Sequence, residues 1–175
     1  MKQIKFIIFI AFLFPIVLFG KNDSLVAIEQ KVELIENNST LDSQIFETEI
    51  ISKELKQSSD GGFELIVYTD STGIRKIVFS TGMSYGMLIT KIYFENDTPI
   101  MIVDIEENFP VKKDQSGLDH EQLVEVYRIS YYIFKWEPLD SIVIFLGKRV
   151  HSKKHVFASE YNYIIDLTRK LLRKN

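Results

Sequence analysis

The chain has 175 residues, of which 46% are hydrophobic and 13% aromatic, and its formal net charge is −3 at pH 7. This length predicts a single domain with one sizeable core, and the mild acidity gives no general attraction for nucleic acid or anionic lipid. Cysteine is absent, which excludes a disulfide scaffold, a thiolate metal site, a cysteine nucleophile and a lipid-carrying N-terminal cysteine.

The first twenty residues predict export from the cytoplasm. Lys2 and Lys5 form a short positive region, Phe6–Phe19 is apolar without interruption, and Gly20 precedes a polar stretch. This order is typical of a secretory signal peptide. At ~1.5 Å per residue the apolar run spans roughly 21 Å, which is less than the ~30 Å hydrocarbon core of a bilayer.

The same segment leaves one alternative open. Leu18, three positions before the expected cleavage, is bulkier than the alanine preferred there, so a retained N-terminal anchor would hold the protein at the membrane. We predict a signal peptide over residues 1–20, a periplasmic or secreted location, and a single α+β domain over residues 21–175. Because the signal removes two lysines, the exported chain carries a net charge of about −5.

After the signal, Ser24–Asn38 predicts a helix, because apolar residues recur at spacings of three and four and make one stripe. The residues of this stripe are Leu25, Ile28, Val32 and Ile35. Residues 41–57 fit neither the helical nor the strand period, so both interpretations stay open there. Residues 58–62, Ser-Ser-Asp-Gly-Gly, predict a loop.

From Phe63 the hydrophobic pattern changes to alternation with period two, which predicts strands. Pro99 begins one of them, at a position where its missing N–H is not yet needed by the ladder. The turn before it contains Asn96-Asp97 in place of the usual Asp-Gly. Short turns join these strands, a pattern typical of an antiparallel meander. The predicted strands cover residues 63–68, 74–79, 87–94 and 100–106.

The polar stretch Asn108–Asp119 predicts the longest loop. Residues 121–136 are strongly β-prone, and a Pro-containing turn connects them to a strand over residues 141–146. Ser159 then caps a final helix with basic residues at its C-terminal end, where the helix dipole favours cations. The predicted fold is α+β: an antiparallel meander sheet of about six strands with N- and C-terminal helices packed on one face.

The chain resembles a loosely defined group of small exported bacterial proteins with an N-terminal helix, a β-meander introduced by Gly-Gly, and a C-terminal helix. The resemblance implies this fold and export, but no catalytic residue, because the group has no assigned activity. The features that carry it are Ser59–Gly62, Gly73–Ile77, Thr90–Phe94, Pro99–Val103, Arg128–Tyr132, Trp136 and the helix after Phe157.

The histidines do not predict a metal site. His151 and His155 have the i, i+4 spacing of metal ligands on a helix. Lys153 and Lys154 lie between them and no acidic partner is adjacent, so an exposed basic connection is the better interpretation. His120, beside Asp119, is interpreted as a solvated loop end.

No catalytic motif is present either. The chain lacks G-x-S-x-G, and the hydroxyl-rich stretch Ser80–Gly86 joins two strands, where glycines serve tight backbone geometry. Asp104, Glu106 and Glu107 form an acidic cluster, which we interpret as a solvated outer sheet face rather than as a calcium loop. We therefore predict no catalytic residue, no metal and no cofactor.

Aromatic residues give the best functional signal. In the β-prone run, Tyr132, Phe134 and Trp136 alternate, so they are predicted to share one face of a strand. An open aromatic face would bind a peptide, a glycan or another partner in the cell envelope. The alternative is a central strand that is covered on both faces.

The sequence thus favours an exported, non-enzymatic α+β domain of binding or envelope-associated type, with no nucleic-acid partner and no membrane contact unless the signal is retained. Two alternatives stay open. An inhibitor of a secreted enzyme would need a protruding loop, for which Asn108–Asp119 is the candidate. An unrecognised hydrolase would need a pocket with convergent polar groups.

Overall fold

The computed structural model describes residues 23–137, 139–148 and 157–174, and the chain divides into two compact units, Met1–Asn38 and Ser39–Asn175. In the first unit, residues 23–36 form an α-helix, which confirms the helix predicted near Ser24–Asn38. Within the described residues, none of the helices combines the length and apolar character that crossing a membrane requires. The predicted signal peptide lies outside the described residues.

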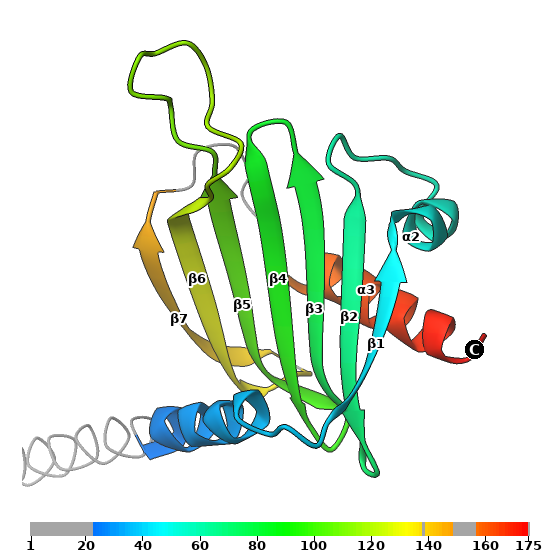
Figure 1. Cartoon of the computed structure of the whole chain (residues 1–175). Helices are drawn as coiled ribbons and strands as arrows, with labels where there is room; N and C mark the ends of the chain where they lie inside the picture. Colours follow the sequence, from blue (N-terminus) through cyan, green and yellow to red (C-terminus); the bar gives the residue numbers. More distant parts are fainter. Residues whose placement is uncertain (1–22, 138, 149–156, 175) are drawn as a thin grey trace, which may run out of the picture. The chain divides into compact units, whose positions relative to one another are not determined.

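The second unit contains one antiparallel sheet in which every strand pairs with its neighbours in the sequence (Figure 1). This arrangement confirms the α+β fold and the meander predicted from period-two alternation. In the described part of the chain the sheet has seven strands, not about six. They are β1 (Asp42–Glu47), β2 (Phe63–Asp70), β3 (Gly73–Met83), β4 (Gly86–Glu95), β5 (Thr98–Asn108), β6 (Val124–Lys135) and β7 (Asp140–Gly147).

The additional strand comes from residues 41–57, where neither period was clear. This segment contains both β1 and the helix α2 (Thr48–Leu55). In β1 only Phe46 is buried, so the strand carries almost no hydrophobic alternation. Thr48 fixes the start of α2 to β2, because its Oγ1 accepts a hydrogen bond from the Phe63 N–H (2.8 Å) and donates one to the Phe63 carbonyl (2.9 Å).

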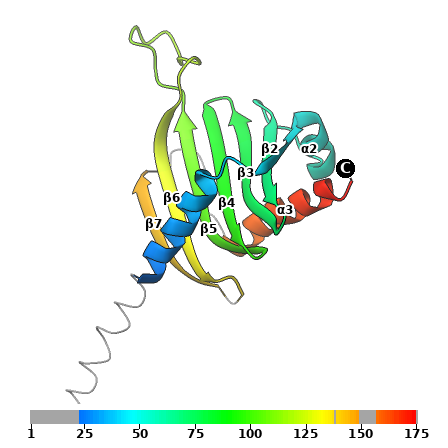
Figure 2. The same ribbon diagram turned by 60° about the horizontal axis from the view of Figure 1, so that its bottom comes forward.

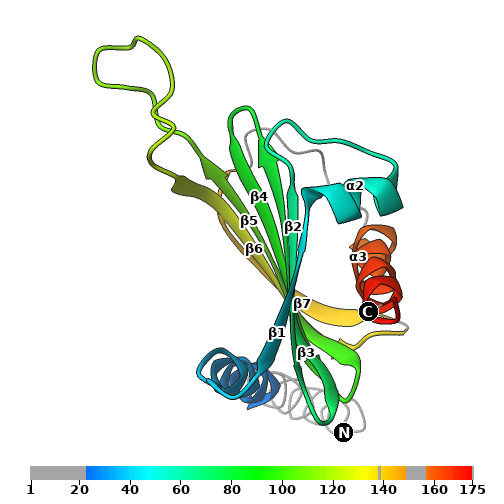
Figure 3. The same ribbon diagram turned by 45° about the vertical axis from the view of Figure 1, so that its right-hand side comes forward.

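The helix α3 (Phe157–Leu172) packs on one face of this sheet (Figure 3). The core lies between them, and it confirms the predicted packing of the C-terminal helix. Strand residues in one register row supply the centre of the sheet side: Val67, Ile77, Ile92, Ile102 and Tyr131. The helix contributes Tyr161, Ile164, Ile165, Leu167 and Leu171.

Charged residues connect α2 to α3. Glu54 on α2 accepts hydrogen bonds from Lys170, whose Nζ is 2.6 Å from Oε2, and from Lys174. These hydrogen bonds lower the pKa of Glu54 to about 2. The ionised carboxylate is therefore the form that holds the two helices together.

Three of the hairpins carry a β-bulge close to their turns. The register shifts lie at Tyr68/Thr69, Tyr93/Phe94 and Ile133/Lys135, near the β2–β3, β4–β5 and β6–β7 connections. A bulge inserts one residue into a strand, bends it and increases its twist. Figure 3 shows the sheet curving beside α3 at this end.

The β4–β5 turn contains Asn96-Asp97 where Asp-Gly is usual, and its backbone conformation shows why these two residues fit. Glu95 pairs with Thr98, so the turn has two residues, and both have positive φ, 49° at Asn96 and 58° at Asp97. This is the conformation of a type I′ hairpin turn, which Asn and Asp tolerate better than other non-glycine residues.

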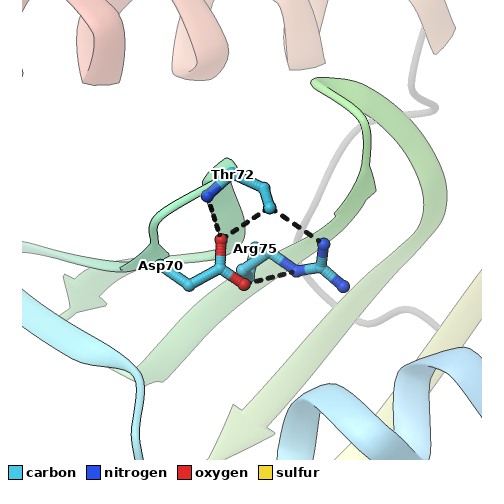
Figure 4. A network of polar contacts seen from close by, with 3 residues as sticks. All are labelled: Asp70, Thr72 and Arg75. Atoms are coloured by element: carbon cyan, nitrogen blue, oxygen red, sulfur yellow. Dashed lines mark hydrogen bonds and ion pairs between the residues drawn. The ribbon is translucent and has the colours of Figure 1, made fainter.

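The β2–β3 turn is held by its own side chains (Figure 4). The Asp70 Oδ1 accepts hydrogen bonds from the Thr72 N–H (2.7 Å) and hydroxyl (2.6 Å), and these bonds lower the pKa of Asp70. Arg75 Nε lies 3.6 Å from Oδ2 of Asp70. Arg75 is also the extra residue of the nearby bulge, because Tyr68 pairs with Lys76 while the next residue of β2 pairs with Ile74.

Candidate functional site

The structure places Tyr132, Phe134 and Trp136, the predicted aromatic face, in different surroundings. Tyr132 is buried, and because both its chain neighbours belong to the core against α3, its side chain lies on the opposite sheet face. Trp136 is partly buried and packs against that core. The bulge between Ile133 and Lys135 inserts Phe134 as the extra residue, so the predicted alternation does not continue to Trp136.

Tyr132 instead belongs to a row of side chains that crosses the sheet on the face away from α3. The strand registers align it with Met101, Tyr93, Lys76 and Tyr68. The Lys76 ammonium lies 4.2 Å from the centre of the Tyr68 ring, a cation–π contact. The sequence did not reveal this tyrosine row, because alternation gives each strand's faces but not the register between strands.

Trp136 borders a cavity of about 400 Å³ in the second unit. The end of β6 supplies the indole, the β4–β5 turn supplies one wall, and α3 supplies the other. The lining residues are Asp97, Thr98, Pro99, Trp136, Glu137, Asn162, Ile165, Asp166 and Arg169. Because Trp136 is the chain's only tryptophan, its fluorescence reports directly on this cavity.

The lining of this Trp136 cavity is mostly polar, and among the described residues the indole of Trp136 is its one aromatic side chain. The lining contains three carboxylates, those of Asp97, Glu137 and Asp166, and one guanidinium, that of Arg169, so it is negatively charged overall. The amide of Asn162 adds both a donor and an acceptor. A few polar groups converging around an aromatic side chain, in a volume of ~300–1,000 Å³, are the features of a small-ligand site.

A second polar group lies inside the core, at Asp104 on β5. Its side chain is 3% exposed, and its two oxygens accept hydrogen bonds from the Thr90 hydroxyl (2.7 Å) and the Tyr161 hydroxyl (2.5 Å). Burial, followed by the charge of Asp104, raises the pKa of Tyr161 far above its ordinary value and also raises the pKa of Tyr163. The Tyr161 phenol therefore stays protonated and holds α3 to the sheet as a donor.

This position corrects the interpretation of the acidic cluster as a solvated sheet face. Asp104 and Glu106 are both buried, with Glu106 fully covered, and only Glu107 is half-buried. Alternation places Asp104 and Glu106 on the same face as Ile102, and that face is the one beneath α3. The carboxylates are tolerated there because side chains such as Thr90 and Asn108 donate hydrogen bonds to them.

Of the other segments that the sequence singled out, the hydroxyl-rich stretch borders a further cavity of about 400 Å³, to which it contributes Ser80 and Gly82. The Ser80–Gly86 stretch runs through the β3–β4 hairpin, where a Cβ on Gly82 would lie 2.7 Å from the Gly61 Cα. His120 stacks edge-on against Phe109, with ring centres 4.6 Å apart. Within the described residues, no group of three or more metal-ligating side chains is gathered. His151 and His155 lie outside the described residues.

The predicted long loop spans residues 109–123 and projects beyond the strands (Figure 2). It is held by its own hydrogen bonds: the Lys112 N–H donates to the Gly117 carbonyl (2.9 Å), and the Asp119 N–H donates to the Pro110 carbonyl (2.7 Å). Val111 pairs with Leu118 as an isolated bridge, yet the Val111 side chain stays 64% exposed. The tip of the loop is therefore exposed, and its shape is held by hydrogen bonds within the loop; we call residues 109–123 the braced loop.

Comparison of this chain with known protein families, with curated proteins and with solved structures found no match.

Proposed function

We propose that this protein is an exported, non-enzymatic binding domain of the cell envelope, and that it binds its ligand in the Trp136 cavity. The observation that carries the proposal is the cavity itself, in which convergent polar groups surround the chain's only indole. The basic, apolar and polar order of residues 1–20 supports export.

The lining of the cavity favours a neutral glycan among the envelope ligands. The carboxylates would repel an anionic ligand, and the polar lining lacks the apolar area that a hydrophobic peptide side chain needs. A sugar ring presents an apolar face to an indole, and its hydroxyls can donate to carboxylates and accept from Arg169 and Asn162. All these groups are present at one cavity.

A fluorescence titration tests the binding. The emission of Trp136 is recorded while neutral N-acetylglucosamine oligosaccharides, soluble peptidoglycan fragments, short peptides or a polyanionic saccharide are added. We expect a saturable change with a neutral glycan and none with the polyanion. If none of these compounds changes the emission, the proposal fails.

Two arginines of α3 provide a matched pair of variants. Both are exposed, but Arg169 lines the Trp136 cavity and Arg173 does not. Arg169→Gln removes hydrogen bonds to the ligand and is expected to weaken binding about tenfold, since hydrogen bonds to charged groups contribute ~1.5–3 kcal/mol. Arg173→Gln is expected to bind like the wild type, and equal weakening by both would assign the effect to general charge.

Export is tested separately by fractionating expressing cells and sequencing the N-terminus of the product. We expect the chain outside the cytoplasm, beginning near Lys21. Membrane-bound chain that retains Met1 would favour the anchor, and cytoplasmic chain that retains Met1 would contradict export.

The braced loop over residues 109–123 favours inhibition of a secreted enzyme as the second candidate. Protease inhibitors bind through a loop that is exposed and already held in shape before contact. Addition of the purified protein to secreted proteases and glycosidases should then lower their activity in proportion to its concentration. A Gly-Ser replacement of residues 111–118 should abolish that effect.

A further inference from the structure

The two edges of the sheet differ in a way that points to a partner. Among the described strands, β1 and β7 are the edges. β1 is short, with six residues, and has a charge at each end and the polar Ser43 and Gln44 between them; short, polar edge strands are one means by which proteins keep sheet edges from pairing with other chains. The centre of β7 carries no charge, no proline and no bulge: Ser-Ile-Val-Ile-Phe-Leu over residues 141–146.

The apolar side chains of β7 are exposed on both faces of the sheet. Val143 and Phe145, on the α3 face, are 45% and 66% exposed, while Ile144 and Leu146, on the other face, are 46% and 64% exposed. A partner that only touched one sheet face would leave half of these side chains in water. A strand added alongside β7 would lie against both sets and would also use the backbone groups of the edge.

We propose that β7 pairs with β7 of a second copy of this chain, antiparallel and about a two-fold axis at Ile144. An axis perpendicular to the sheet keeps each residue on its own face, so Ile144 meets Ile144, Val143 meets Phe145, and Ile142 meets Leu146. Every one of these cross-strand pairs is apolar. The joined sheets form one continuous sheet with α3 of both copies on the same side.

Charge complementarity selects this register. In the pair centred at Ile144, Asp140 of each copy lies at the end of the second copy's strand, where Lys148 follows Gly147. Opposite charges therefore meet twice, once at each end of the paired strands. Registers displaced in either direction separate these charges and bring apolar side chains opposite Ser141 or Gly147, so they match less well.

The first test is the oligomeric state of the protein as the cell produces it, measured by sedimentation over a wide range of concentration. We expect a reversible monomer–dimer equilibrium. A monomer at every concentration would overturn the proposal.

Charge reversal then tests the register. Asp140→Lys alone and Lys148→Asp alone each place like charges together at both ends, and each is expected to weaken dimerisation about tenfold. The double variant restores opposite charges and should return the affinity to near the wild-type value. A double variant no tighter than the single ones would overturn the register, and circular dichroism confirms that each variant is folded.

The absence of cysteine allows a direct geometric test. Ile144→Cys places two thiols at the axis, within reach of a disulfide after small adjustment of the strands, because opposed Cβ atoms lie ~4.5–5.5 Å apart. We expect mild oxidation to cross-link this variant. Ile45→Cys, on the opposite edge and 55% exposed, should remain uncross-linked. Cross-linking of Ile45→Cys with none at Ile144→Cys would overturn the proposal.

Discussion

Asp104 shows how a carboxylate can be held within a hydrophobic core. An uncompensated buried charge would cost several kcal/mol, but Thr90 and Tyr161 both donate hydrogen bonds to it. The bond from Tyr161 joins β5 to α3 across the core, over a sequence separation of 57 residues. The hydrogen bond between Tyr161 and Asp104 therefore compensates the carboxylate charge and also fixes the position of α3 on the sheet.

Removal of the Tyr161 hydroxyl should destabilise the fold. Tyr161→Phe keeps the ring but takes one donor from a buried carboxylate, so the free energy of unfolding is expected to fall by about 1–3 kcal/mol. Tyr163→Phe is the control, because its side chain is 42% exposed; a change within about 0.5 kcal/mol is expected there. Urea melts at pH 7 measure both, and equal effects would contradict the role of the Asp104 bond.

The same variant predicts a pH dependence. The folded pKa of Tyr161 is raised, so its contribution to stability is fully present below the ordinary tyrosine pKa of 10.0. It is lost progressively as the pH rises above that value, because the unfolded chain can ionise and the folded chain resists it. Tyr161→Phe should therefore lose less stability than the wild type between neutral pH and pH values above 10.

Trp136 should behave as a half-covered side chain. It packs against the core and also borders the cavity, so a soluble quencher should reach its indole partly. Trp136→Ala is expected to cost about 2 kcal/mol, below the ~3–5 kcal/mol of a fully buried tryptophan. Acrylamide quenching and urea melts measure the two properties. A fully shielded indole together with a loss above about 4 kcal/mol would contradict a rim position.

At the scale of elements, the contact between α2 and α3 depends on the charge of Glu54. Its folded pKa is lowered to about 2, so its stabilising effect is present above the ordinary carboxyl pKa and is lost as the pH falls toward 2. Glu54→Gln should therefore lower stability at pH 7, and the difference from the wild type should shrink as the pH falls through about 2. Glu121→Gln, in the exposed loop, is the control. Added salt should reduce the difference at pH 7, because exposed ion pairs are screened.

Period-two alternation predicted the strands and their order, but it assigned side chains to the wrong sheet face beyond a β-bulge, because the bulge inserts one residue. Strict alternation would place Ile74 on the face of Val78, yet it belongs to the core with Ile77 and Phe79, because Arg75 is an inserted residue. The same cause displaced Trp136 from the face of Tyr132. No local signal marks such an insertion, since it is defined by the register between two paired strands and not by the residues of one strand.

The sequence pattern also did not predict which face of the sheet is covered by a helix. The alternation correctly put Asp104 and Glu106 on one face of β5, but the carboxylates suggested solvent where the structure has α3. The Trp136 cavity could not be predicted either, because its walls come from three segments that are far apart in the chain. The aromatic pattern drew attention to Trp136 as part of an open face shared with Tyr132 and Phe134, and not as part of a cavity.

For the whole molecule, the strict meander affects how the chain can fold while it is being synthesised or exported. Each strand needs only the strand made just before it, so the sheet can assemble hairpin by hairpin in the order in which residues emerge from a ribosome or a translocation pore. Among the described elements of the second unit, α3 alone must find partners that emerged long before, such as Glu54, which lies 120 residues from Lys174. Until that last helix arrives, the sheet face over Ile77 and Ile102 stays uncovered. The interval before α3 emerges is therefore when this apolar sheet face is open to aggregation.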